Sequence, residues 1–238
     1  MKYLLLSTLL VWALVSCNSS KNIKEYYYPI DTMGSEGLVY EFQSLDSLPP
    51  YYWYYSMQER PDGKYLVATN YNTFYEIEQI SIEKIVSNGT KLHQYTLYQK
   101  DSTGKAMAVE TSIKSNGYFP FEVKDTSGVF MYELKWTDPI DSIHHTTLVR
   151  NKHFEKDSVY AYNGKSVPCV IFRSKDLIDD DRNGHLEIRY SGREIYAQGL
   201  GLVYTEKNIQ NRIIAYRLHS QFGMDKLAQK SKELYQNQ

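Results

Sequence analysis

Residues 178–190, IDDDRNGHLEIRY, carry the oxygen-bearing side chains that a calcium-binding loop uses. Such a loop takes ligands at positions 1, 3 and 5, a glycine at position 6 and a bidentate acid at position 12. The segment offers, in the matching places, Asp179, Asp181, Asn183, Gly184 and, at the ninth position, Glu187. The twelfth position is Tyr190, so the acid that supplies most of the site's charge is missing. We therefore favour a polar hairpin turn at Asn183-Gly184. The alternative is a weak structural calcium ion held by Asp179, Asp181, Asn183 and Glu187, and no other cofactor is expected.

A second conspicuous stretch is PPYYWYYSMQ at residues 49–58, with four tyrosines and a tryptophan in five positions. On a strand, Tyr51, Trp53 and Tyr55 would face one way, and Tyr52 and Tyr54 the other. Burial of one face in the core accounts for the pattern by itself. The alternative is that Tyr51, Trp53 and Tyr55 form a ligand-binding platform for a glycan or a partner protein.

The sequence contains few patterns that are typical of catalysis. The sequence holds no His-Glu-x-x-His and no Gly-x-Ser-x-Gly motif, and its Ser-x-x-Lys matches at 81–84 and 102–105 lack partner motifs. Cys169 lies in the apolar run SVPCVIF, where we expect a buried, inert thiol. The sequence therefore predicts no catalytic residue, and we expect a protein that is not an enzyme.

The first seventeen residues, MKYLLLSTLLVWALVSC, join Lys2 to an apolar run that is shorter than the ~20 residues of a spanning helix. The run ends in Leu14-Val15-Ser16-Cys17, which resembles the lipobox of bacterial lipoproteins. The resemblance implies that residues 1–17 are a signal peptide and that Cys17 becomes a lipidated N-terminus, so that the membrane is a partner through this lipid. Asn18 then favours the outer membrane, facing the periplasm. Residues 18–35 are expected to be a tether.

The remaining residues, 36–238, suit a single β-rich domain. The 23 tyrosines favour strands, and a net charge of −1 without a basic stripe predicts no binding of nucleic acid. Turn signals recur at Asp62-Gly63, Asn88-Gly89, Asn116-Gly117, Asn163-Gly164 and Asn183-Gly184. Segments of alternating polarity between them predict roughly a dozen antiparallel strands. Residues 75–87 also fit a helix, and we favour a strand there. We expect a mainly β meander that forms a curved half-barrel, a barrel or a sandwich, followed by one short helix near residues 223–236.

The segment YAQGLGLVYTEKNIQNRIIAYRLHS contains Tyr196, the pair Gly199 and Gly201, Leu202-Val203 and a last alternating run up to Leu218. Residues 196–218 resemble the closing hairpin of periplasmic lipid carriers of the LolA and LppX type and of uncharacterised lipoproteins similar to them. The resemblance implies a curved sheet with an acyl-chain cavity. An early amphipathic helix, usual in those carriers, is not evident in this sequence.

Two functions fit these observations. The first is a non-catalytic binding module of the cell envelope for an apolar or lipid-like ligand. The second is a structural or interaction subunit of an envelope assembly, with a tyrosine-rich surface that docks a partner protein or a glycan.

Overall fold

A computed structural model describes residues 20–236 except 125, 127 and 183. Cys17, the predicted lipidation site, lies outside these residues. In chain order the elements are β1 (Lys21–Asn22), η1 (Lys24–Tyr26), β2 (Leu38–Ser44), β3 (Tyr51–Arg60), β4 (Gly63–Tyr71), β5 (Ile77–Val86), β6 (Gly89–Lys100), β7 (Ala106–Glu110), β8 (Ser112–Pro120), β9 (Glu122–Val123), β10 (Val129–Thr137), β11 (His145–Tyr162), β12 (Lys165–Asp180), β13 (Leu186–Ala197), β14 (Gly201–Ile209), β15 (Arg212–Phe222) and α2 (Met224–Gln236).

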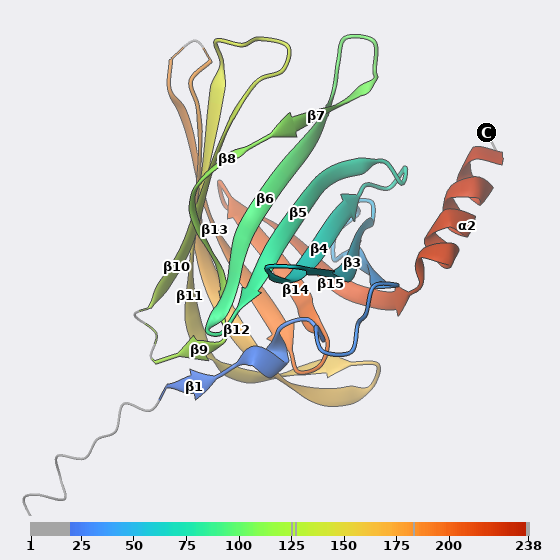
Figure 1. Ribbon diagram of the computed structural model, residues 1–238, viewed down its shortest axis with the longest axis vertical. Helices are drawn as coiled ribbons and strands as arrows, with labels where there is room; N and C mark the ends of the chain where they lie inside the picture. Colours follow the sequence, from blue (N-terminus) through green and yellow to red (C-terminus); the bar gives the residue numbers. More distant parts are fainter. Residues whose placement is uncertain (1–19, 125, 127, 183, 237–238) are drawn as a thin grey trace, which may run out of the picture.

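The chain forms a closed antiparallel barrel of twelve strands with one short C-terminal helix (Figure 1). Neighbours in sequence are neighbours in the wall, from β2 through β6, β8, and β10 through β15. The barrel closes where β15 pairs with β2, and β7 forms an extra hairpin beside the upper part of β6. The predicted β meander and the final helix are confirmed, and of the three shapes considered the closed barrel is the correct one.

Most of the expected turns fall between strands. Asn163 and Gly164 join β11 to β12 with φ of +49° and +74°, backbone angles that both residue types tolerate. The Asn116-Gly117 prediction is wrong, because both residues lie inside β8, where Asn116 pairs with Tyr132 of β10. A Cβ on residue 117 would lie 3.2 Å from the Met131 carbonyl oxygen, so the glycine serves close strand contact there.

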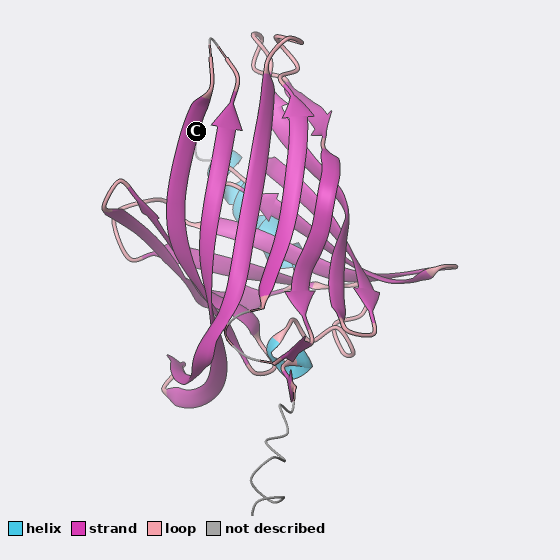
Figure 2. Ribbon diagram, turned by 90° about the vertical axis from the view of Figure 1, so that its left-hand side faces the viewer, coloured by secondary structure: helices cyan, strands magenta, loops and turns pink. Residues whose placement is uncertain are grey.

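The two ends of the barrel differ. At one end strands β3, β5, β8, β11, β13 and β15 begin and their neighbours finish; we call this the open end. At the other end residues 20–34 enter the barrel and close it, as Figures 1 and 2 show. We call residues 20–34 the plug.

Of the predicted tether over residues 18–35, the described residues 20–34 form the plug and are not a tether. Ile23 and Tyr27 are 0% and 1% exposed. The Tyr27 ring centroid lies 4.8 Å from that of Phe119, and the Ile23 amide donates to the Phe121 carbonyl. The polar run NSSK covers only residues 18–21. The following segment NIKEYYYPIDTM is rich in apolar side chains, and these complete the barrel core.

Helix α2 packs on the outside of the barrel. Its buried Leu227 contacts a small cluster that includes Val39 and Tyr52, and Lys230 pairs with Glu41 at 3.4 Å. Within the described part of the chain, α2 and the short η1 are the helices, and neither is long and apolar enough to span a membrane. The position of α2 leaves the interior of the barrel to the side chains of the strands and the plug.

Candidate binding cavity

The barrel encloses a cavity of about 790 Å³ that reaches the open end. Its rim includes Pro49 and Pro50 of the β2–β3 loop and Phe74 of the β4–β5 loop. Nine tyrosines of the described chain line the cavity: Tyr28, Tyr51, Tyr55, Tyr95, Tyr118, Tyr132, Tyr190, Tyr196 and Tyr216. The volume lies in the range of small-molecule sites.

One wall of the cavity is aromatic and comes from the stretch noted in the sequence. Tyr51, Trp53 and Tyr55 of β3 all line the cavity, whereas Tyr52 and Tyr54 pack outside under α2. The rings of Trp53 and Tyr55 are stacked with centroids 5.8 Å apart, and Tyr51 meets Tyr216 edge-on at 4.7 Å. The predicted face is thus assembled inside the barrel rather than on the outer surface.

The floor of the cavity joins the plug to the barrel through hydroxyl groups. The Tyr28 hydroxyl donates to that of Tyr55 over 2.5 Å, and the two rings lie 4.0 Å apart. Burial raises the pKa of both tyrosines well above the ordinary value. These hydroxyls therefore stay protonated and can donate or accept hydrogen bonds.

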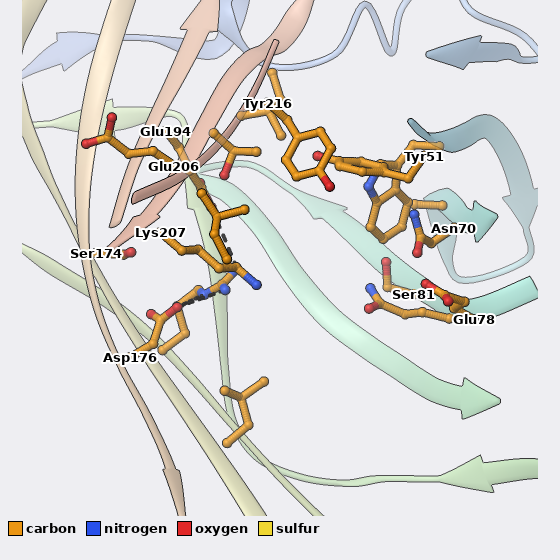
Figure 3. Close-up of a pocket in the computed structure, with 18 of the residues that line it drawn as sticks. Tyr51, Asn70, Glu78, Ser81, Ser174, Asp176, Glu194, Glu206, Lys207 and Tyr216 are labelled. Atoms are coloured by element: carbon orange, nitrogen blue, oxygen red, sulfur yellow. Dashed lines mark hydrogen bonds and ion pairs between the residues drawn. The ribbon is translucent and has the colours of Figure 1, made fainter. Parts of the chain in front are cut away.

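Opposite the aromatic wall lies a set of charged side chains. Arg150 of β11 donates to Asp176 of β12 at 2.8 and 2.9 Å. The Lys152 ammonium lies 3.2 Å from Glu194 of β13, and the Tyr196 hydroxyl donates to the same carboxylate oxygen at 2.8 Å. Figure 3 shows this wall on one side, with Asp176, Glu194 and Lys207, and Tyr51, Asn70, Glu78 and Ser81 on the other.

The charged wall holds Glu194 in its ionised form. Burial by itself would raise the pKa of this carboxyl, but the charges of Lys152 and Arg150 and the Tyr196 hydrogen bond bring it below the ordinary value. The predictions from the sequence did not include this wall. The alternation along β11 contained an indication of it. Arg150 and Lys152 alternate with their neighbours so that they share a strand face with Leu148 and Phe154, which face inward.

Two buried polar atoms on the cavity lining, Ser81 Oγ and Asp176 Oδ1, have no hydrogen-bond partner among the described residues. They lie on opposite walls. Buried polar atoms are normally paired, so a polar ligand atom at either position would satisfy a group that the protein leaves open.

Glu83 of β5 is buried at the floor, 1% exposed, and accepts hydrogen bonds from the Tyr27 hydroxyl at 2.6 Å and the Thr90 hydroxyl at 2.7 Å. Burial raises the pKa of this carboxyl to about 7, although both hydrogen bonds oppose the shift. Near neutral pH the plug is therefore held by a carboxyl group that is partly protonated.

A pH-dependent stability follows from Glu83. Because its folded pKa exceeds the value of 4.5 expected when unfolded, its stabilising proton is fully present below pH 4.5 and lost as the pH rises to about 7. Wild-type protein should lose roughly 3 kcal/mol over this interval relative to Glu83→Gln. Urea unfolding at pH 4.5, 6 and 7.5 measures the difference.

The control for this experiment is Glu78→Gln, on the same strand but exposed. It should leave the wild-type pH profile unchanged. Parallel stability curves for wild type and Glu83→Gln between pH 4.5 and 7.5 would contradict the assignment.

The acids of the predicted calcium loop lie at the end of the β12–β13 hairpin and have other partners. The Asp179 carboxylate contacts His185 Nδ1 at 3.1 Å, and Asp181 accepts from the His145 amide. Glu187 pairs with Arg189. The described residues contain no group of three or more acidic, histidine or cysteine side chains placed to hold a metal. Asn183 lies outside them, and calcium binding at this loop stays a prediction.

Comparisons with known proteins found similarity of fold. No family model matches the chain, and no curated protein does. Two crystal structures share the architecture. One is a "putative lipoprotein" from Parabacteroides distasonis, with a TM-score of 0.52 and 15% identity, over 81% of this chain and 95% of that chain. The other is a "putative exported protein with YmcC-like fold" from Bacteroides fragilis, with a TM-score of 0.55 and 12% identity, over 81% and 96%. The predicted likeness to lipid carriers of the LolA type is not confirmed.

Proposed function

We propose that this protein is a non-catalytic binding protein of the bacterial cell envelope, and that its barrel holds a small polar ligand with a flat ring face, such as a short saccharide. The observation that carries the proposal is the cavity of about 790 Å³, with the aromatic wall of Tyr51, Trp53 and Tyr55 on one side and charged groups on the other. Aromatic rings stack on ring faces, while a few placed polar groups provide orientation.

The charged wall argues against a wholly apolar ligand such as the acyl chain that the resemblance to lipid carriers implies. Arg150 and Asp176 line the cavity together with Glu194 and Lys207. Covering charged groups with hydrocarbon removes water from them without replacing its hydrogen bonds, which costs several kcal/mol. A ligand that carries hydroxyl, amide or charged groups avoids this cost.

The proposed location combines two lines of support. The residues before the plug resemble a lipobox ending in Cys17, and the two similar structures are described as a lipoprotein and an exported protein of bacteria. We place the protein at the outer membrane facing the periplasm. Three residues lie between Cys17 and Lys21, so the two positions are at most about 14 Å apart. The plugged end then lies near the membrane and the open end faces away from it, which suits a ligand that arrives from water.

Trp53→Ala should abolish retention of this ligand. The substitution removes the largest stacking surface of the aromatic wall and should weaken binding by about 2 kcal/mol or more, roughly thirtyfold. Full-length protein is purified in an uncharged detergent from the membranes of a Gram-negative host and weighed by native mass spectrometry. Wild type should carry an extra small-molecule mass that Trp53→Ala lacks.

Tyr54→Ala is the matched control, because Tyr54 is the next residue along β3 and packs outside the barrel. It should keep the extra mass. The proposal would be wrong if wild type carried no additional mass, or if both variants retained the ligand equally.

An interaction subunit is the second candidate function. At the open end the β10–β11 loop exposes Ile140 and Ile143, at 66% and 74%, and the β12–β13 hairpin exposes Leu186. An ion pair between Asp138 and Arg182 ties the two hairpins together. These neighbouring apolar tips suit a protein partner. This role requires no ligand in the barrel, so the native mass separates it from the first.

A further inference from the structure

The charges on the charged wall do not balance. Arg150 is paired with Asp176, and Lys152 with Glu194. Lys207 of β14 lies on the same side of the cavity (Figure 3). No carboxylate lies within 4.0 Å of its ammonium among the residues that the structure describes. Glu206 also lines the cavity and is paired with Arg193. These described residues thus hold four cations against three anions, and Lys207 is the cation without an ion-pair partner among them.

Lys207 lies on the inner face of β14, and its side chain is exposed rather than buried. It alternates with Thr205 and Ile209, which also line the cavity, so these three residues share the inner face of β14. Its ammonium lies 5.6 Å from the centre of the Tyr190 ring. Its accessible surface is therefore in contact with the cavity.

The surrounding groups leave the Lys207 charge uncompensated. Desolvation inside the barrel, and next the charge of Arg150, lower its pKa, whereas Asp176 and Glu194 oppose this only in part. Both carboxylates already accept hydrogen bonds from other cations. A bound anion would add the missing negative charge, with a charge-assisted hydrogen bond to the ammonium.

The other acidic side chains of the cavity decide where an anion can bind. Glu78 lies on the opposite wall (Figure 3), and Glu83 lies at the floor, where its pKa of about 7 leaves it partly protonated. An anionic group is therefore favoured beside Lys207 and disfavoured beside Glu78. The ring of the same ligand would then lie toward Trp53 and Tyr51.

We infer that Lys207, with Arg150 beside it, forms an anion subsite, and that the ligand carries a carboxylate, sulfate or phosphate group on its ring-bearing body. The ligand class rests on the proposed binding function, whereas the subsite itself can be tested without the ligand. An acidic saccharide has this combination of a ring face and an anionic group.

Sulfate is the probe for the subsite. Full-length protein in an uncharged detergent is dialysed until its native mass shows no bound ligand. It is then equilibrated with radiolabelled sulfate at constant ionic strength, with chloride as the replaced ion. Wild type should bind one sulfate saturably, and Lys207→Met should weaken this binding roughly tenfold or more.

Lys175→Met is the matched control, since Lys175 is exposed on the outer side of β12 and the substitution removes the same charge. It should bind sulfate as wild type does. Absence of saturable sulfate binding in wild type, or an equal loss in both variants, would overturn the subsite.

The outcomes separate the subsite from the proposed function. A retained ligand that proves to be neutral, in a protein that binds no sulfate, overturns the anion subsite and leaves ligand binding intact. Sulfate binding that depends on Lys207, in a protein that retains no ligand, supports the subsite and contradicts retention of a ligand.

Discussion

Lys152→Met is expected to lower the free energy of unfolding by about 3–5 kcal/mol, because it leaves the Glu194 carboxylate buried without its main partner. Lys152 is 3% exposed, and its ammonium also lies 4.9 Å from the centre of the Tyr118 ring. Two partners of Glu194 remain in this variant: the Arg150 guanidinium, 3.6 Å from the carboxylate, and the Tyr196 hydroxyl. The loss of unfolding free energy should therefore lie toward the lower end of the about 3–5 kcal/mol range. Urea unfolding at pH 7 measures the loss.

Arg173→Met provides the comparison, because Arg173 of β12 pairs with Glu155 of β11 on the exposed side of the barrel wall. Its expected cost is about 0–1 kcal/mol. The double variant Lys152→Met, Glu194→Gln should recover part of the loss, since it removes the unpaired charge. Equal costs for Lys152→Met and Arg173→Met would refute the view that the charged wall is a buried network.

The pH dependence supplies an independent measurement. In wild type the lowered pKa of Glu194 contributes stability above the unfolded value of 4.5, and this contribution is lost as the pH falls. Removal of Lys152 raises the folded pKa of Glu194. The gap between wild type and Lys152→Met should therefore narrow below about pH 4.5.

Gly201→Ala should destabilise the protein by about 3–4 kcal/mol, through strain at a positive φ and overpacking of a filled core. Gly201 has φ of +81°, and a Cβ there would lie 2.5 Å from the Tyr28 ring of the plug. Tyr28 is buried between Tyr27, Tyr40 and Tyr55 and has no room to withdraw. Thermal and urea unfolding measure the effect.

Gly199→Ala is a close control for the same substitution. Gly199 lies in the same turn with φ of +71°, but a Cβ there meets nothing within 4 Å. It should cost only the backbone strain, about 1–2 kcal/mol. The difference between the two variants isolates the contact between β14 and the plug, and equal costs would show that the plug does not hold Tyr28 against this strand.

The plug links stability to the binding cavity. Tyr28 contributes both to the floor of the cavity and to the contact with Gly201. Its ring lies against Tyr55, which stacks on Trp53. A substitution that displaces the plug should therefore also disturb the aromatic wall.

Local patterns in the sequence were enough to predict strands, most turns and the shared face of Tyr51, Trp53 and Tyr55. Asn163-Gly164 turns the chain because both residues accept positive φ, whatever the rest of the molecule does. The alternation along β3 follows from strand geometry alone. These features depend on residues that are neighbours in sequence.

The plug and the charged wall could not be predicted in this way. Alternation shows which residues share a face, but not which face lies inside a barrel that closes between β2 and β15, strands far apart in sequence. Arg150 and Lys152 look like the polar face of an exposed strand until Asp176, Glu194 and Tyr196 from two other strands compensate their burial. The turns and the pairing of adjacent strands were thus determined by local sequence. The interior was decided only by the tertiary structure, because burial and charge compensation are properties of residues brought together from distant parts of the chain.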